Sequence, residues 1–177
     1  MTLAIGMVGL AHDDVRHRLL RAGVRILACD PECRAASRME EGIEARADAA
    51  GVARSLAAPR VAWIELATGF ATELAIADVW PEFAEGDVIV SAGHGDAADA
   101  RRRAAALASA RIHFVDCVVH RDPALSLRLG GHDAAIAVLT PYLDIAAGRA
   151  AWTHGGQSGA SYHCGMDERK TAGNASP

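Results

Sequence analysis

The sequence predicts an α/β fold in which a doubly wound, mostly parallel sheet carries helices on both faces. The main observation is that short apolar runs alternate with helical segments of about 10 to 15 residues, a pattern typical of strand–helix–strand units. The second observation is the composition: 51% of the 177 residues are hydrophobic, alanine supplies much of that share, and only 5% are aromatic. A core of small aliphatic side chains suits helices packed on a sheet, and the length fits one domain.

The elements are predicted in order along the chain. Strands are predicted at 3–9, 24–30, 60–67, 86–93, 111–117 and 124–131, with a last short edge strand within 149–155. Helices are predicted at 13–23, 31–42, 46–58, 70–83, 96–110 and 132–148. Strands one to five are expected to be parallel. We expect the fourth helix to break near Pro81, the last helix to be interrupted at Pro141, and Asp96 to cap its own helix.

The predicted domain spans residues 1–155. From residue 156 the sequence is rich in glycine, serine and charged residues and has no periodicity. Residues 156–177 are therefore predicted to form a tail, of which roughly the last dozen residues are disordered.

The first turn of the predicted sheet departs from the pattern of a nucleotide-binding turn. In a parallel sheet, ligands bind beyond the carboxyl ends of the strands, where the strand order reverses. A Rossmann turn reads G-x-G-x-x-G there, whereas this chain reads Gly9-Leu10-Ala11-His12-Asp13-Asp14. Either aspartate is expected to be the helix N-cap, where its charge would repel a pyrophosphate about 5 Å away by about 3 kcal/mol per charge pair. The aspartates are then either substitutes for the charge of a ligand or ordinary helix caps.

Charge and cysteine content exclude several classes of function. The net charge of −4 argues against a basic surface for nucleic acid or membranes, and Arg101–Arg103 are expected to form a solvated helix face. Neither a signal peptide nor a stretch of ~18 apolar residues is recognised, so a cytoplasmic location is expected. The four cysteines contain no C-x-x-C pair and are expected to be reduced, and no metal site is predicted. The histidines, His12 among them, are expected at the surface or in turns.

Several segments together resemble a known family. They are "IGMVGL" followed by a helix, "PRVAWIELATG", "EGDVIVSAGHGDAADARRRAAALASARIHFVD", "LRLGG" and "SYHCG". In this order and spacing they resemble the N-terminal domain of decarboxylating 6-phosphogluconate dehydrogenases of the shorter, NAD-type bacterial group. The resemblance spans roughly residues 1 to 165. It implies a Rossmann-like fold and an NAD or NADP cofactor.

Gly9, Leu10 and Asp30 match family positions that bind the phosphates and the adenosine of the cofactor. The family's first turn is G-L-G-x-M-G, so Gly9 and Leu10 match, while Ala11 and Asp14 replace glycines. The resemblance assigns Gly9, Leu10 and Ala11 to cofactor binding. It also assigns Asp30, after the second strand, to the adenosine ribose, which favours NAD over NADP. The alternative for Asp30 is a turn residue at the end of a strand.

The remaining matches are sparser. After the third strand the family's V-P-A-G is here L-A-T-G, so Gly69 alone survives. After the fourth strand the family's D-G-G-N-S is here S-A-G-H-G, which keeps Gly93. His94 replaces an asparagine that touches substrate and nicotinamide. It is the one candidate catalytic residue, as a proton shuttle, with an ordinary loop histidine as the alternative.

The departures from the family concern catalysis. The segment "CVVHRDPA" contains no Ser-Gly-Gly substrate loop. After Gly165 the glycine-rich turn that leads to the family's lysine is missing, and Lys170 is not expected to fall in the family's K-x-x-x-N pattern. The sequence therefore predicts an NAD(P)-binding-domain protein of oxidoreductase ancestry that does not run the decarboxylating reaction alone. The alternatives are a non-catalytic scaffold that binds a protein partner or a second copy and no longer binds NAD(P), or a truncated or frameshifted fragment.

Overall fold

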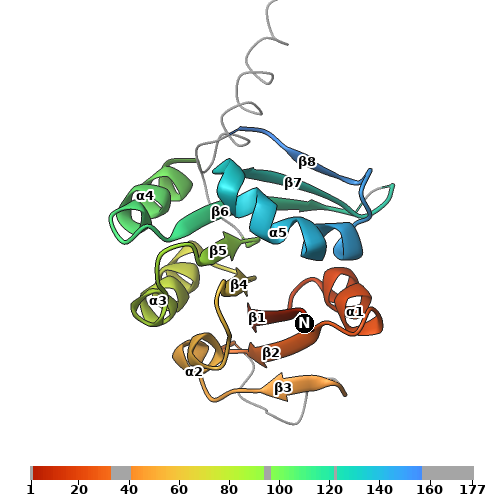
Figure 1. Ribbon diagram of the computed structural model, residues 1–177, viewed down its shortest axis with the longest axis horizontal. Helices are drawn as coiled ribbons and strands as arrows, with labels where there is room; N and C mark the ends of the chain where they lie inside the picture. The colour runs from red at the N-terminus through yellow and green to blue at the C-terminus, as the bar shows by residue number, and fades with distance from the viewer. Residues whose placement is uncertain (1, 33–40, 94–96, 122, 157–177) are drawn as a thin grey trace, which may run out of the picture.

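The computed structural model describes residues 2–32, 41–93, 97–121 and 123–156. They form one eight-stranded sheet in the order β3-β2-β1-β4-β5-β6-β7-β8 (Figure 1). The strands are β1 (Ala4–Val8), β2 (Arg25–Cys29), β3 (Ile43–Ala45), β4 (Val61–Ile64), β5 (Val88–Ser91), β6 (His113–His120), β7 (Ser126–Gly131) and β8 (Trp152–His154). The helices are α1 (Asp13–Arg21), α2 (Ala49–Arg54), α3 (Gly69–Val79), α4 (Ala97–Ala108) and α5 (Asp133–Ala146).

The pairing of the strands confirms the predicted fold class. Strands β3, β2, β1, β4, β5 and β6 are parallel neighbours, β7 runs antiparallel to β6, and β8 runs parallel to β7. The chain builds the sheet outward from β1 in one direction and then from β4 in the other. The order therefore reverses between β1 and β4, and the carboxyl ends of these two strands mark the expected ligand crevice.

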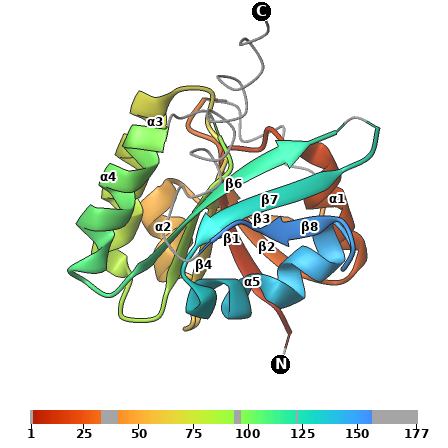
Figure 2. The same ribbon diagram turned by 90° about the horizontal axis from the view of Figure 1, so that it is seen from above.

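Helices cover both faces of the sheet, and each face has its own core. Helices α1 and α5 lie on one side and α2, α3 and α4 on the other, as both views show (Figures 1 and 2). Alternate residues of a strand point to opposite faces, so Met7 and Trp63 pack toward α1 and α5, whereas Val8 and Ile64 pack toward the other three helices. All four side chains are almost fully buried, and each such burial contributes about 1.5 to 3 kcal/mol.

The structure extends the prediction at one edge of the sheet. Strand β3 was not predicted, because three residues are too short for a periodic signal. It pairs with β2, and the carboxylate of Glu44 contacts the guanidinium of Arg25 across the two strands. Helix α2 is shorter than the predicted 46–58, because Asp48 caps it by accepting a hydrogen bond from the Gly51 N–H at 2.6 Å.

The two predicted proline effects have different outcomes. Helix α3 ends at Val79 and a 3-10 turn at Trp80–Glu82 holds Pro81, which confirms the break expected there. The interruption expected at Pro141 is wrong, because α5 continues through it. Proline costs a helix about 3 kcal/mol, but Leu139 and Leu143, on either side of it, are fully buried against the sheet and hold the helix together.

Several predictions fall on residues outside the described ranges. They are most of the helix at 31–42, the cap at Asp96 and the tail from 157 onward. Among the residues that the structure describes, no helix is both long enough and apolar enough to cross a membrane.

Candidate functional site

The carboxyl ends of β1, β4, β5 and β6 surround a cavity of about 460 Å³ at the point where the strand order reverses. Its ionisable lining consists of His12, Glu32, Glu65, Cys117 and Arg121, and its remaining walls are largely small apolar side chains and backbone. A crevice of this size at the switch point of a parallel sheet is the expected place for a small-molecule ligand.

Gly9 and Gly93 are required at this edge by backbone packing. Gly9 has φ +79°, and a Cβ atom there would lie 2.1 Å from the carbonyl oxygen of Glu65. A Cβ atom on Gly93 would lie 2.6 Å from the carbonyl oxygen of Leu66. The turns after β1 and β5 thus both press against the turn after β4, so only glycine fits at these two positions, whether or not a ligand is bound.

The start of α1 differs from the prediction. The N-cap is His12, which makes no side-chain cap hydrogen bond, and neither aspartate is the cap. Asp13 instead contacts Arg16 at 2.6 Å, and the carboxylate of Asp14 lies 3.8 Å from the guanidinium of Arg121. Both aspartates belong to the first turn of α1, and each side chain faces an arginine.

The same two arginines fix the turn itself. The guanidinium of Arg16 donates to the carbonyl oxygen of Leu10 at 2.9 Å, and that of Arg121 donates to the carbonyl oxygen of Ala11 at 3.2 Å. Leu10 and Ala11, two of the predicted cofactor contacts, are thus held by side chains from α1 and from the end of β6.

Glu65 is the residue that sequence reasoning missed. Its side chain is fully buried, and its carboxylate accepts a hydrogen bond from the backbone N–H of His12 at 2.8 Å. The same carboxylate also accepts from the indole N–H of Trp63 and lies 3.2 Å from Nδ1 of His12. The sequence signal that could have identified it is a glutamate directly after the apolar strand "VAWI", at the sheet edge where ligands are expected. His12, expected in a turn or at the surface, is in the turn but its side chain is only 16% exposed.

Asp30 follows the last residue of β2 and is half-buried. Its carboxylate accepts a hydrogen bond from the Glu32 N–H at 3.1 Å, and the carboxylate of Glu32 in turn accepts from the Ala67 N–H at 3.2 Å. A second cavity of about 430 Å³ adjoins this turn, with Phe70 and Leu74 of α3 among its apolar walls. The turns after β2 and β4 are therefore linked across the edge of the sheet.

The cysteines of this edge are not activated nucleophiles. Burial raises the pKa of the Cys29 thiol to about 12, with further upward contributions from Asp48, Asp30 and Asp78. Burial also raises the pKa of Cys117 well above its usual range, with Asp116 and Glu65 adding to the effect. Both are free thiols, and both stay protonated at neutral pH.

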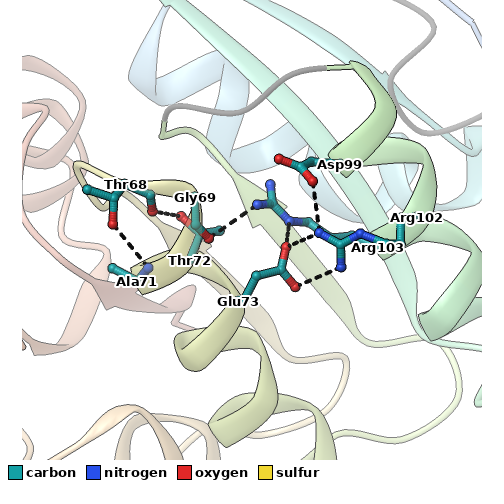
Figure 3. Close-up of polar contacts among 8 residues, drawn as sticks. All are labelled: Thr68, Gly69, Ala71, Thr72, Glu73, Asp99, Arg102 and Arg103. Atoms are coloured by element: carbon teal, nitrogen blue, oxygen red, sulfur yellow. Dashed lines mark hydrogen bonds and ion pairs between the residues drawn. The ribbon is translucent and has the colours of Figure 1, made fainter.

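Gly69 begins α3, and Thr68 caps this helix by accepting from the Ala71 N–H at 3.1 Å. Figure 3 shows how the turn is tied to α4: the guanidinium of Arg103 contacts the Glu73 carboxylate at 2.7 Å and donates to the Gly69 carbonyl oxygen at 3.4 Å. The Arg103 side chain is only 2% exposed, so the expectation of a solvated basic face is wrong at this position.

Arg102 completes this cluster from the solvent side. It is 58% exposed and contacts both Glu73 and Asp99 at 2.8 Å (Figure 3). Hydrogen bonds from Arg102 and Arg103 lower the pKa of Glu73, even though partial burial acts in the opposite direction. The cluster therefore joins two carboxylates and two guanidinium groups between α3 and α4.

The structure brings most of the predicted site residues to one edge of the sheet. Gly9, Leu10, Ala11 and Gly93 lie around the first cavity or in the turns that form it. Asp30 and Gly69 belong to the turns that lead into the second cavity. His94, the candidate catalytic residue, lies outside the described residues. Within the described ranges, no group of three or more His, Cys, Asp or Glu could hold a metal ion.

The expectation that Lys170 lies outside the family's K-x-x-x-N pattern is wrong. Lys170-Thr171-Ala172-Gly173-Asn174 has the K-x-x-x-N spacing of the family's lysine and asparagine, so Lys170 cannot be set aside on spacing. What the chain lacks is the glycine-rich turn between H-C-G and that lysine. All of these residues lie outside the described ranges.

Sheet order, switch point and glycine turn together define a dinucleotide-binding domain of the Rossmann class. Residues 4–156 match the model of the NAD binding domain of 6-phosphogluconate dehydrogenase, and the chain belongs to this family.

One relative is a 6-phosphogluconate dehydrogenase, and solved structures of other dehydrogenases and reductases share the fold. An NAD(+)-dependent, decarboxylating 6-phosphogluconate dehydrogenase from Haloferax volcanii is 29% identical, and the match covers 93% of this chain but 57% of that protein. A 3-hydroxyisobutyrate dehydrogenase structure from Mycobacterium tuberculosis has a TM-score of 0.80 at 22% identity, covering 97% of this chain and 60% of its own. An imine reductase variant from Myxococcus stipitatus, in complex with NAD+, has a TM-score of 0.77 at 16% identity over 98% and 62%. The chain thus spans little more than half the length of these relatives.

Proposed function

We propose that this chain binds NAD in preference to NADP along the carboxyl edge of its sheet, and that it does not carry out an oxidative decarboxylation by itself. The observation that carries the proposal is the position of Asp30 beside the glycine turn. The Gly9 N–H donates to the carbonyl oxygen of Cys29 at 2.9 Å, so the turn and Asp30 are held at adjacent strand ends. A carboxylate at the end of the second parallel strand is placed to accept hydrogen bonds from ribose hydroxyls.

The adenosine half of the cofactor would lie over the second cavity. Its apolar walls, including Phe70 and Leu74, suit a flat base. Asp30, which stands in the sequence between the lining residues Cys29 and Pro31, suits an unphosphorylated ribose. A 2′-phosphate would instead meet the carboxylates of Asp30 and Glu32, which repel it. This arrangement supports the preference for NAD.

The other half of the cofactor would lie over the first cavity. The backbone of Leu10 and Ala11 would face the pyrophosphate, and the turn at Gly93 would border the nicotinamide, whereas the turn at Gly69 would lie on the side of the adenosine. When bound, the cofactor supplies hydride transfer, and the residues described here would position it. His94 is the proposed proton shuttle, since it stands where the family has an asparagine. The missing Ser-Gly-Gly loop and glycine-rich turn are the reasons for proposing no decarboxylation by this chain alone.

A second candidate function is a scaffold that binds a protein partner or a second copy of this chain and no longer binds the cofactor. One observation favours it: the His12 N–H at the start of α1 already donates to Glu65. Titration with NADH and with NADPH, followed by calorimetry, separates the two functions. NADH binding that is tighter than NADPH binding supports the first. Absence of binding for both nucleotides contradicts it.

A further inference from the structure

We propose that Glu65 is an intrachain ligand of the α1 N-terminus and competes there with the phosphates of the cofactor. The proposal rests on the proposed function, because it concerns the same turn. In proteins of this class, free backbone N–H groups and the helix dipole attract a phosphate to the start of the first helix. Here the N–H of His12, the N-cap residue, donates to a carboxylate of the protein itself at 2.8 Å.

The fold explains why this particular carboxylate reaches the helix. The N–H of Glu65 donates to the Val8 carbonyl oxygen at 2.8 Å, which continues the β1–β4 ladder by one residue beyond β4. Alternation along the strand gives Glu65 the same face as Trp63, and this is the face covered by α1. The side chain therefore points from the central strand end directly under the first turn of α1.

Moving the Glu65 side chain out of this position would cost free energy. Its side chain is fully buried, and two donors, the His12 N–H and the Trp63 indole N–H, depend on it. Withdrawing the carboxylate would leave both donors without an acceptor, which is costly inside a protein. An incoming phosphate would therefore meet a fixed negative charge and lose one of its usual donors.

The aspartates of the turn do not have this role. Asp13 is 66% exposed and contacts Arg16, and Asp14 is 60% exposed and faces Arg121. Solvent and the paired arginines screen their charges. Neutralising Glu65 is thus expected to affect phosphate binding far more than neutralising Asp14.

The test compares Glu65→Gln, with Asp14→Asn as the matched control, against the parent chain. Two ligands are used: NADH, measured by its Kd, and inorganic pyrophosphate, measured by the rise in melting temperature. We expect Glu65→Gln to tighten NADH binding by at least about tenfold and to gain stabilisation by pyrophosphate, because a buried like charge is removed. Asp14→Asn is expected to change the Kd by less than about threefold.

Each outcome separates the inference from the proposed function. Equal Kd values for NADH and equal effects of pyrophosphate in the parent chain and in Glu65→Gln overturn the inference. If both proteins nevertheless bind NADH, the proposed function remains supported. If pyrophosphate stabilises Glu65→Gln but neither this variant nor the parent chain binds NADH, the inference is supported and the proposed function is contradicted. An equal gain in Asp14→Asn also overturns the inference, because any nearby charge would then suffice.

A second pair of variants guards against misfolding. The side-chain amide introduced by Glu65→Gln would direct one N–H toward the indole N–H of Trp63, where two donors would meet. Trp63→Phe removes that donor, so Trp63→Phe/Glu65→Gln is compared with Trp63→Phe alone by the same two ligands. Circular dichroism verifies the fold of each variant, and the same gain is expected in this pair. Its absence in folded protein overturns the inference.

Discussion

Gly9 and Glu65 make contacts at this edge that stabilise the fold without a ligand. Position 9 requires glycine because the carbonyl oxygen of Glu65 leaves no room for a Cβ atom. The carboxylate of Glu65 accepts the hydrogen bond from the N–H of His12 at the start of α1. Asp13 and Asp14, which the sequence made prominent, contact arginines instead. At the scale of residues, the turn is therefore completed by a partner 53 positions away in the sequence.

Substitution of Gly9 tests the close approach between the turns after β1 and β4. Gly9→Ala is expected to lower the free energy of unfolding by about 2 to 4 kcal/mol, because the new Cβ both clashes with backbone and requires positive φ. Gly23→Ala is the matched control: its φ is +76°, but nothing lies within 4 Å of the added Cβ. Its cost should be about 1 kcal/mol, which is the backbone term alone. Urea unfolding measures both, and equal losses would contradict the argument.

At the scale of elements, charged pairs join neighbouring helices and strands. Helices α3 and α4 are linked through Glu73, Arg102 and Arg103, next to the turn at Gly69 (Figure 3). The short edge strand β3 is linked to β2 through Glu44 and Arg25. The link between α3 and α4 lies beside the turn at Gly69, whose carbonyl oxygen accepts a hydrogen bond from Arg103, so it helps to position this turn. The link at β3 lies at the amino end of β2, away from the candidate site.

The buried arginine should matter more than the exposed one. Arg103→Met is expected to lower the free energy of unfolding by about 1 to 3 kcal/mol, because it removes a desolvated partner of the partly exposed Glu73. Arg102→Met removes an exposed partner and should cost less than about 1 kcal/mol. Guanidinium chloride is unsuitable because it screens charge, so urea unfolding is the measurement. A larger effect of Arg102→Met would refute this ranking.

The link at β3 gives a dependence on pH. Hydrogen bonds from Arg25 and then Arg46 lower the pKa of Glu44 to about 2, below its ordinary value of 4.5. A lowered folded-state pKa stabilises the fold above the ordinary value, and this contribution is lost as pH falls toward 2. The parent should therefore be more stable than Glu44→Gln at pH 7, and the difference should shrink between about pH 4.5 and pH 2. Urea unfolding across this range tests it, and a difference independent of pH would count against the pairing.

At the scale of the whole molecule, the described residues form the cofactor-binding domain of a larger family architecture. The sheet order and the family match over residues 4–156 account for most of this chain, while the relative from Haloferax volcanii is covered to 57%. The two cavities lie at the edge of the sheet where the cofactor is proposed to bind.

We expect no oxidation of 6-phosphogluconate by this chain alone. The physical reason is that the reaction needs a positioned general base and substrate contacts, and the sequence lacks the family's Ser-Gly-Gly loop and the glycine-rich turn before its lysine. The measurement is NADH formation from NAD and 6-phosphogluconate, followed by the absorbance of NADH against a heat-treated control. Formation of NADH above that control would refute the expectation, and its loss in Lys170→Met would then identify Lys170 as the base.

The sequence by itself determined the fold class, most strands and helices, and the edge of the sheet where the site lies. This was possible because the alternation of buried strands with helices is a local pattern, and because ligand crevices follow from strand order. Tertiary structure alone decided the long-range partners: Glu65 with His12, Arg121 with Asp14, and Arg103 with Glu73. It also kept α5 continuous through Pro141 and added β3. Most of these contacts join residues far apart in the sequence, and burial and pairing in the folded chain outweigh local preferences at each of them.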